Sequence, residues 1–228
     1  METVNKNDFI ELKYTGYTNG SIFDSNIEED LKKLNPEEKP RATIIVLGQG
    51  MLVPGLDSAL EGKEVGKDYE IEIKSKDAFG PRKQNLVKTI PLKIFHQKEM
   101  EPRPGMVFAL DDMLAKVVAV SGARVLTDFN NPLAGKDLKY KIKIVRKIED
   151  EKEKCKVLLE KMLRFVPEFE IKDKIIIKGP KGIEVFVKAF NDKFKELIGK
   201  ELAFEEKKDN KNIKKDILES SVSKPSDN

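Results

Sequence analysis

Apolar and polar positions alternate through much of the first 150 residues, and this alternation predicts strands. In residues 8–18, Ile10, Leu12 and Tyr14 alternate with Glu11 and Lys13, as expected for a strand that buries one face. Three further strands are predicted by the same criterion, over residues 42–47, 68–74 and 138–146. Between the first two strands, a charged stretch carries Ile27, Leu31 and Leu34 at helical spacing before Pro36, which predicts a surface helix.

Residues 86–131 have a different pattern, which predicts a separate structural unit. They contain short apolar runs, which we interpret as a set of short strands, interrupted by the Pro-containing turn at 101–105. Residues 92–95 are included in the first of these strands. The strand pattern of the N-terminal part resumes only at residue 138.

From residue 151 the apolar spacing becomes helical. Six residues form one stripe that Pro167 ends: Cys155, Leu158, Leu159, Met162, Leu163 and Val166. Two strands are predicted over 169–179 and 181–189, followed by a second helix from Asn191 to Gly199. The polar residues 206–228 predict a disordered tail.

Composition narrows the function classes. Lys and Arg number 43 and Asp and Glu 40, so the near-balance argues against the concentrated basic face of a nucleic-acid binder. No apolar run approaches a membrane span and the N-terminus lacks a signal-peptide layout, so we expect a cytoplasmic protein. A single Cys and a single His exclude an internal disulfide and His-rich metal tracts, and we expect neither a metal nor another cofactor.

The glycine-rich segment 48–66 raises the possibility of a phosphate site, but its spacing argues against one. After Gly50 and Gly55, a P-loop requires Lys and Ser or Thr, and this chain has Leu56 and Asp57. The dinucleotide fingerprint also fails, because Val53 occupies the position of its third glycine. The segment therefore predicts an apolar loop that exposes Leu52, Val53 and Leu56, followed by a short helix.

Several motifs together resemble the FKBP family of peptidyl-prolyl cis/trans isomerases. They are YTG at 14–16, FDS at 23–25, LGQGMLVPGLDSALEGKEVG at 47–66, DAFG at 77–80 and NNPLAGKDLKYKIKI at 130–144. Some fifty residues separate the last two motifs. In this spacing the chain resembles the long, SlyD-like archaeal-type subclass, in which a chaperone domain is inserted in the flap. The resemblance covers about residues 4–150, and none was found for 151–228.

The resemblance implies an α+β fold, with an FKBP-like antiparallel β half-barrel wrapped on a short helix. It also implies an inserted small β domain, whereas the pattern of residues 151–205 predicts a C-terminal α/β domain. The implied domains are 1–85 plus 132–150 for the isomerase and 86–131 for the insert-in-flap chaperone domain. Beyond the resemblance, we predict 151–205 as the C-terminal domain and 206–228 as the tail.

The resemblance also implies which residues line the proline pocket. They are Tyr14, Phe23, Asp24, Leu52, Val53, Leu56, Phe79 and Tyr140; the Val53 N–H would bind a substrate carbonyl, and Asp24 and Tyr14 would be hydrogen-bonded at the pocket edge. Taken singly, each apolar residue could be plain core, and Asp24 could cap a turn. The chain departs from short family members at Leu56, which replaces a Trp, and at Phe79, which replaces a Tyr. The His-rich tail of many SlyD-like members is absent.

The implied function is a prolyl isomerase with holdase activity on unfolded or partly folded proteins and proline-containing peptides. Methionine adapts to irregular partners, so a client-binding surface is predicted on the insert at Met100, Met106, Phe108, Leu110, Met113 and Leu114, although these residues could instead fill a small core. The alternative is a binding-only chaperone or scaffold with vestigial isomerase activity. We expect no nucleic-acid or membrane partner. The broad stripe at 152–166 also suggests a homodimer through the C-terminal domain.

Overall fold

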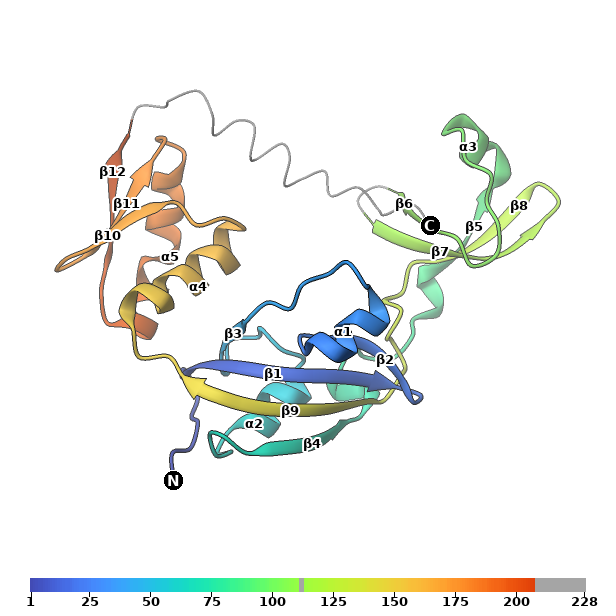
Figure 1. Ribbon diagram of the computed structural model, residues 1–228. Coiled ribbons are helices and arrows are strands. Elements are labelled where there is room, and N and C mark those ends of the chain that lie inside the picture. Colours follow the sequence, from blue (N-terminus) through green and yellow to red (C-terminus); the bar gives the residue numbers. More distant parts are fainter. Residues whose placement is uncertain (111–112, 208–228) are drawn as a thin grey trace. The chain divides into compact units, whose positions relative to one another are not determined.

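The computed structural model describes residues 1–110 and 113–207, and it divides the chain into two units, Met1–Lys147 and Ile148–Asn228. The first unit contains two sheets and the second contains one (Figure 1). This mixture of antiparallel sheets and short helices confirms the predicted α+β class. The predicted tail falls almost wholly on residues 208–228, which lie outside the described residues.

The larger sheet of the first unit is antiparallel and has the order β2-β1-β9-β4, with β3 also paired to β1. The strands are β1 (Phe9–Thr18), β2 (Ser21–Ser25), β3 (Thr43–Val46), β4 (Asp68–Ile73) and β9 (Leu138–Lys147). Strands β1 and β9 are distant in sequence but lie side by side in the sheet (Figure 1). The four strands expected from alternation are therefore present, and β2 follows β1 through a tight turn at Asn19 and Gly20.

Two short helices accompany this sheet, α1 (Glu28–Leu34) and α2 (Pro54–Leu60). Pro54 occupies the first turn of α2, where its missing N–H costs nothing. Leu56 and Leu60 of α2 are buried in the same core as the inward residues of the sheet, including Leu12, Tyr140 and Ile144. Burial of this apolar face, rather than the propensity of a seven-residue helix, stabilises α2.

The strands that lie between β4 and β9 in the sequence form a second antiparallel sheet with its own core, and we call this part of the chain the insert. The strands β5 (Val87–Pro91), β6 (Val107–Leu110), β7 (Met113–Ser121) and β8 (Arg124–Asp128) have the order β5-β8-β7-β6. The core consists of Ile90, Phe95, Phe108, Ala115, Val117 and Val125.

Within this part, the expectation of strands alone was wrong, because residues Leu92–Gln97 form the helix α3. Leu92 and Phe95 are three positions apart, so a helix places both against the insert core. The Phe95 ring is 4.9 Å from that of Phe108 and almost edge-on to it. This packing decides the local conformation.

Polar contacts join the segments that lead into and out of the insert. The first segment lies between the 3₁₀ turns η1 (Ser75–Asp77) and η2 (Gln84–Leu86), and the second begins at the end of β8. The Lys83 N–H donates to Asn130 Oδ1 at 2.8 Å, and Asn130 Nδ2 donates to the Lys83 carbonyl at 3.0 Å. Arg82 forms an ion pair of 2.8 Å with Asp128. The two chain segments therefore leave the larger sheet side by side.

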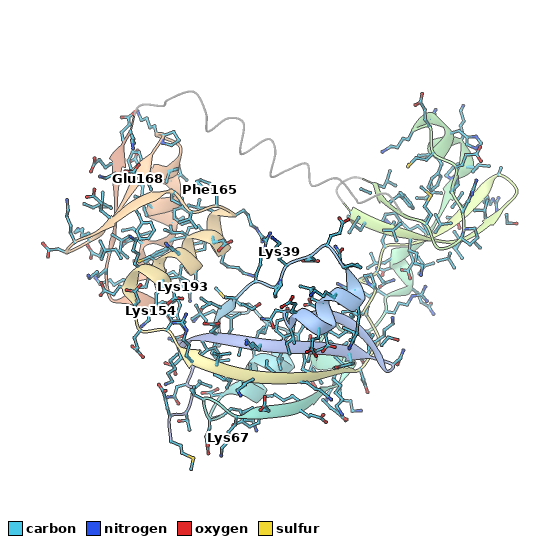
Figure 2. All side chains as sticks on the ribbon, viewed as in Figure 1. Lys39, Lys67, Lys154, Phe165, Glu168 and Lys193 are labelled. Carbon is cyan, nitrogen blue, oxygen red and sulfur yellow. The ribbon has the colours of Figure 1, made fainter. Side chains whose placement is uncertain are left out.

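The second unit has a three-stranded sheet and two helices. Strand β11 (Ile175–Gly179) lies between β10 (Glu168–Ile171), to which it is antiparallel, and β12 (Leu202–Glu206), to which it is parallel. The helices are α4 (Glu151–Leu163), capped by the Asp150 carboxylate, and α5 (Ile183–Ile198). Phe165 lies just beyond the end of α4 (Figure 2).

The prediction of a strand at 181–189 was wrong, because residues 183–189 belong to the helix α5. Ile183, Val185 and Val187 alternate and locally favour a strand. Phe186, Phe194 and Leu197 instead share one helical face and are buried in the unit. Strand β12 was not predicted, and residues 169–179 form two strands, β10 and β11, rather than one.

In the part of the chain that the structure describes, no helix is long and apolar enough to cross a membrane.

Candidate active site

A cavity of about 230 Å³ opens on the larger sheet of the first unit. Strands β1, β3 and β9, the loop before α2 and the loop after η1 all contribute to its wall. Its lining residues are Leu12, Tyr14, Asp24, Thr43, Ile45, Met51, Leu52, Val53, Leu56, Phe79, Tyr140 and Ile142.

The structure brings together the pocket residues expected from the sequence. All of them except Phe23 line the cavity. Phe23 packs behind it, where its ring meets Tyr140 edge-on at 5.8 Å and 84°. Leu56 and Tyr140 are buried, whereas Phe79 is 38% exposed and so can reach a ligand.

Gly16 explains how Phe23 reaches this position. It is paired with Asp24 on one side and with Tyr140 on the other. A Cβ on Gly16 would lie 2.6 Å from the Phe23 ring. Because this residue has no side chain, the ring can lie directly on the backbone of β1 and support Tyr140.

The polar edge of the cavity is formed by Tyr14 and Asp24. The Tyr14 hydroxyl donates to Asp24 Oδ2 at 2.8 Å. Burial, followed by the charge of Asp24 and this hydrogen bond, raises the pKa of Tyr14 above its ordinary value of 10.0. Burial, and then the charge of Asp24, raises the pKa of Tyr140 to about 12. Both phenols are therefore neutral near pH 7.

The main chain offers a further donor at Val53, the residue before α2. Its carbonyl accepts from the N–H groups of Leu56 and Asp57. Within residues 1–110 and 113–207, no acceptor is found for the Val53 N–H itself. Binding of a substrate carbonyl by this N–H, which the resemblance implies, stays a prediction.

The sequence did not predict Thr43, Ile45 and Met51 as part of this cavity. Thr43 and Ile45 are two positions apart on β3 and therefore share a face, which is the only sequence signal that could have identified them. Met51 lies beside them because its sulfur accepts the Val46 N–H at 3.2 Å.

The lining of the cavity is mostly apolar, and Asp24 is the only charged side chain among the described residues that form it. Across the described residues, no group of three or more His, Cys, Asp or Glu side chains could hold a metal ion. The site can desolvate a ligand and offer it a few hydrogen bonds.

The six residues predicted as a client-binding surface are divided by the structure. Phe108 belongs to the insert core, and Met100, Met106 and Leu110 pack against that core. Met113 and Leu114 are exposed, by 47% and 71%. Two of the six predicted residues are therefore exposed, whereas alternation along β6 turns Phe108 inward.

Comparison with known proteins identifies the family. A model of the FKBP-type peptidyl-prolyl cis-trans isomerase matches residues 1–109, and a model of the FKBP26 IF domain matches residues 88–133. The chain is 32% identical over 147 residues to a short-type peptidyl-prolyl cis-trans isomerase of Methanocaldococcus jannaschii, covering 63% of this chain and 94% of that protein. The chain belongs to the FKBP-type peptidyl-prolyl cis-trans isomerases.

Two bacterial relatives of this isomerase carry the name SlyD. The Escherichia coli K12 protein is 34% identical over 102 residues, covering 43% of this isomerase and 52% of SlyD. The Haemophilus influenzae protein is also 34% identical over 102 residues. The isomerase thus spans about half the length of these relatives, and the expected SlyD-like long type is consistent with them.

Proposed function

We propose that the isomerase binds the proline of its substrate in the cavity and acts by desolvating the X-Pro bond. Amide rotation has a barrier of ~18–20 kcal/mol. Resonance makes the planar amide more charge-separated than the twisted one, so an apolar site favours the twisted form. Each ~1.4 kcal/mol gained in this way raises the rate tenfold.

Within this proposal, each group at the cavity has a separate role. Leu56 and Tyr140 form a buried apolar floor for the proline ring. The Val53 N–H binds a substrate carbonyl, and Phe79 covers the open side. Asp24 accepts a hydrogen bond from the Tyr14 hydroxyl, which fixes the phenol at the pocket edge. The observation that carries the proposal is that the predicted residues converge on one apolar cavity.

The site assignment is tested by Asp24→Ala and Phe79→Ala. Both side chains lie at the cavity and contribute little to the core, so each variant should stay folded. We expect each to lower kcat/KM for a proline tetrapeptide by about tenfold or more, in line with a lost transition-state contact. A protease-coupled assay of cis-proline conversion measures this, with circular dichroism as the folding control. Unchanged rates in both variants would contradict the site.

We further propose holdase activity through the outer face of the insert sheet, which we define by Val107, Ala109, Leu114, Lys116, Ala119 and Leu126. The register of the strands supports this face as one surface. Ala109 is paired with Leu114 and Ala119 with Leu126, on the side away from the insert core. Val107, Leu114 and Leu126 are exposed by 58%, 71% and 36%. Exposed apolar groups in one place mark interaction surfaces.

The double variant Leu114→Ser and Leu126→Ser tests the outer face. Both side chains are exposed, so the insert should stay folded, and we expect suppression of aggregation of an unfolded protein to fall by at least about half because apolar contact area is lost. Leu34→Ser is the matched control, since Leu34 is also an exposed leucine, at 42%, but lies on the helix α1 and outside the insert. Equal suppression by the double variant and the wild type would exclude the outer face as the client-binding surface.

The same tetrapeptide assay distinguishes an active isomerase from the alternative, a binding-only module. If the folded wild-type protein converts cis-proline only at the uncatalysed rate, its role is binding alone. The apolar cavity supports catalysis instead, because desolvation needs no further group.

A further inference from the structure

Strand β1 has a gap in its pairing beside the cavity. On one edge, β3 pairs with Phe9 through Leu12 and β2 pairs with Thr15 through Thr18. Tyr14 lies between these two ladders and has no strand partner on that edge. Its position must therefore be fixed by another group.

The side chain of Asn26 fills this gap. Asn26 Oδ1 accepts the Tyr14 N–H at 2.8 Å, and Asn26 Nδ2 donates to the Leu12 carbonyl at 2.7 Å. The main-chain N–H of Asn26 donates to the Tyr14 carbonyl at 3.1 Å. The amide therefore pairs with β1 as a strand peptide would, and it needs both its acceptor and its donor to do so.

Asn26 also connects this pairing to β3. Its Nδ2 donates a second hydrogen bond, of 2.9 Å, to Thr43 Oγ1. Both Tyr14 and Thr43 line the cavity, whereas Asn26 does not. One amide thus binds three cavity residues, Leu12, Tyr14 and Thr43, on two strands.

The bond to Asn26 leaves the Thr43 hydroxyl as a donor. Its oxygen accepts from Asn26, and no acceptor for its hydrogen is found among the described residues. Thr43 is also the only Ser or Thr at the cavity. A peptide carbonyl in the cavity can take this hydrogen.

We propose that Asn26 is a positioning residue of the isomerase, which holds Tyr14 so that its hydroxyl reaches Asp24 and holds Thr43 so that its hydroxyl binds the substrate peptide. The proposal rests on the cavity being the isomerase site. Asn26 touches no substrate and acts through the two residues that do.

A double-mutant cycle on the full chain tests it, using Asn26→Ala, Thr43→Val and the combined variant with a proline tetrapeptide. We expect Asn26→Ala to lower kcat/KM by about tenfold. Thr43→Val should also lower it, and the double variant should stay within about twofold of Asn26→Ala, because the two residues act as a unit. Thr43→Ser keeps the hydroxyl and should restore most of the activity lost in Thr43→Val.

Tyr69→Phe is the control for a merely structural effect. The Tyr69 hydroxyl accepts the Glu64 N–H at 2.8 Å in the same sheet, and Tyr69 does not line the cavity. This variant should lose stability in urea but keep kcat/KM. Wild-type kcat/KM in folded Asn26→Ala would overturn the proposal, and additive losses in the double variant would overturn the route through Thr43.

Three further outcomes are decided when Asp24→Ala and Phe79→Ala are measured in the same assay. If Asn26→Ala does not fold, the comparison of Thr43→Val with Thr43→Ser decides, and equal activity of the two would overturn the proposal. If Asp24→Ala and Phe79→Ala lose activity while Asn26→Ala keeps it, this proposal fails and the cavity assignment stands. If those two variants also keep full activity, the cavity assignment itself fails.

Discussion

At the residue scale, burial of the two phenols at the cavity makes the protein less stable at alkaline pH. The pKa of Tyr140 is raised to about 12 from 10.0, so the unfolded chain loses this proton first. The stabilisation from the neutral phenol is complete below pH 10 and is lost as the pH rises toward 12. We expect the melting temperature to fall over this interval, and to fall less in Tyr140→Phe. Equal slopes for both proteins would contradict the burial of this hydroxyl.

The residues of the cavity were predictable to different degrees. Tyr14, Asp24 and Phe79 could be named because they occupy motifs of a family that the sequence resembles. Thr43 and Met51 could not, since an isolated strand residue and a loop methionine carry no chemical signature. Their role depends on Asn26 and on the Val46 N–H, two contacts that only the folded chain creates.

At the element scale, the placement of α2 depends on Gly55. A Cβ on this residue would lie 2.6 Å from Ile73 and 3.0 Å from the Asp77 carbonyl oxygen. Gly55→Ala should therefore push α2 away from β4 and η1 and lower the free energy of unfolding by about 1–3 kcal/mol. Urea denaturation measures this, with exposed Ser58→Ala on the same helix as control. A loss no larger than that of the control would show that α2 tolerates the displacement.

The elements that were predicted wrongly share one physical cause. Alternation along β1 and β9 was sufficient because both strands have one buried face. In α5 the local sequence of Ile183, Val185 and Val187 favours a strand, but burial of Phe186, Phe194 and Leu197 on one face determines the outcome. Tertiary packing of this kind overrides local propensity, and it is not visible in a short window of sequence.

At the scale of the whole molecule, the C-terminal unit exposes several large apolar side chains to solvent. Val185 is 73% exposed, and Phe165 and Val166 are 38% and 41% exposed (Figure 2 labels Phe165). We propose that they contribute to pairing of two copies, since a small unit has little core of its own. A monomeric mass at micromolar concentration would exclude this pairing.

We propose a division of labour, in which the cavity isomerises proline and the insert binds the unfolded chain. Replacing residues 86–131 with a short Gly- and Asn-rich turn separates the two activities. The Gly135 N–H donates to the Gly80 carbonyl at 2.7 Å, outside the replaced segment, and this contact keeps the two ends close together. Closing a shorter loop changes the free energy only slowly, and every cavity residue remains.

The direct measurement is kcat/KM of this variant on a proline tetrapeptide and on a protein whose refolding is limited by proline isomerisation. We expect tetrapeptide activity within about threefold of the wild type and a loss of about tenfold or more on the refolding protein, because the insert no longer raises the local concentration of the chain. Equal catalysis of refolding by the variant and the wild type, or loss of the tetrapeptide activity in a folded variant, would contradict the division of labour.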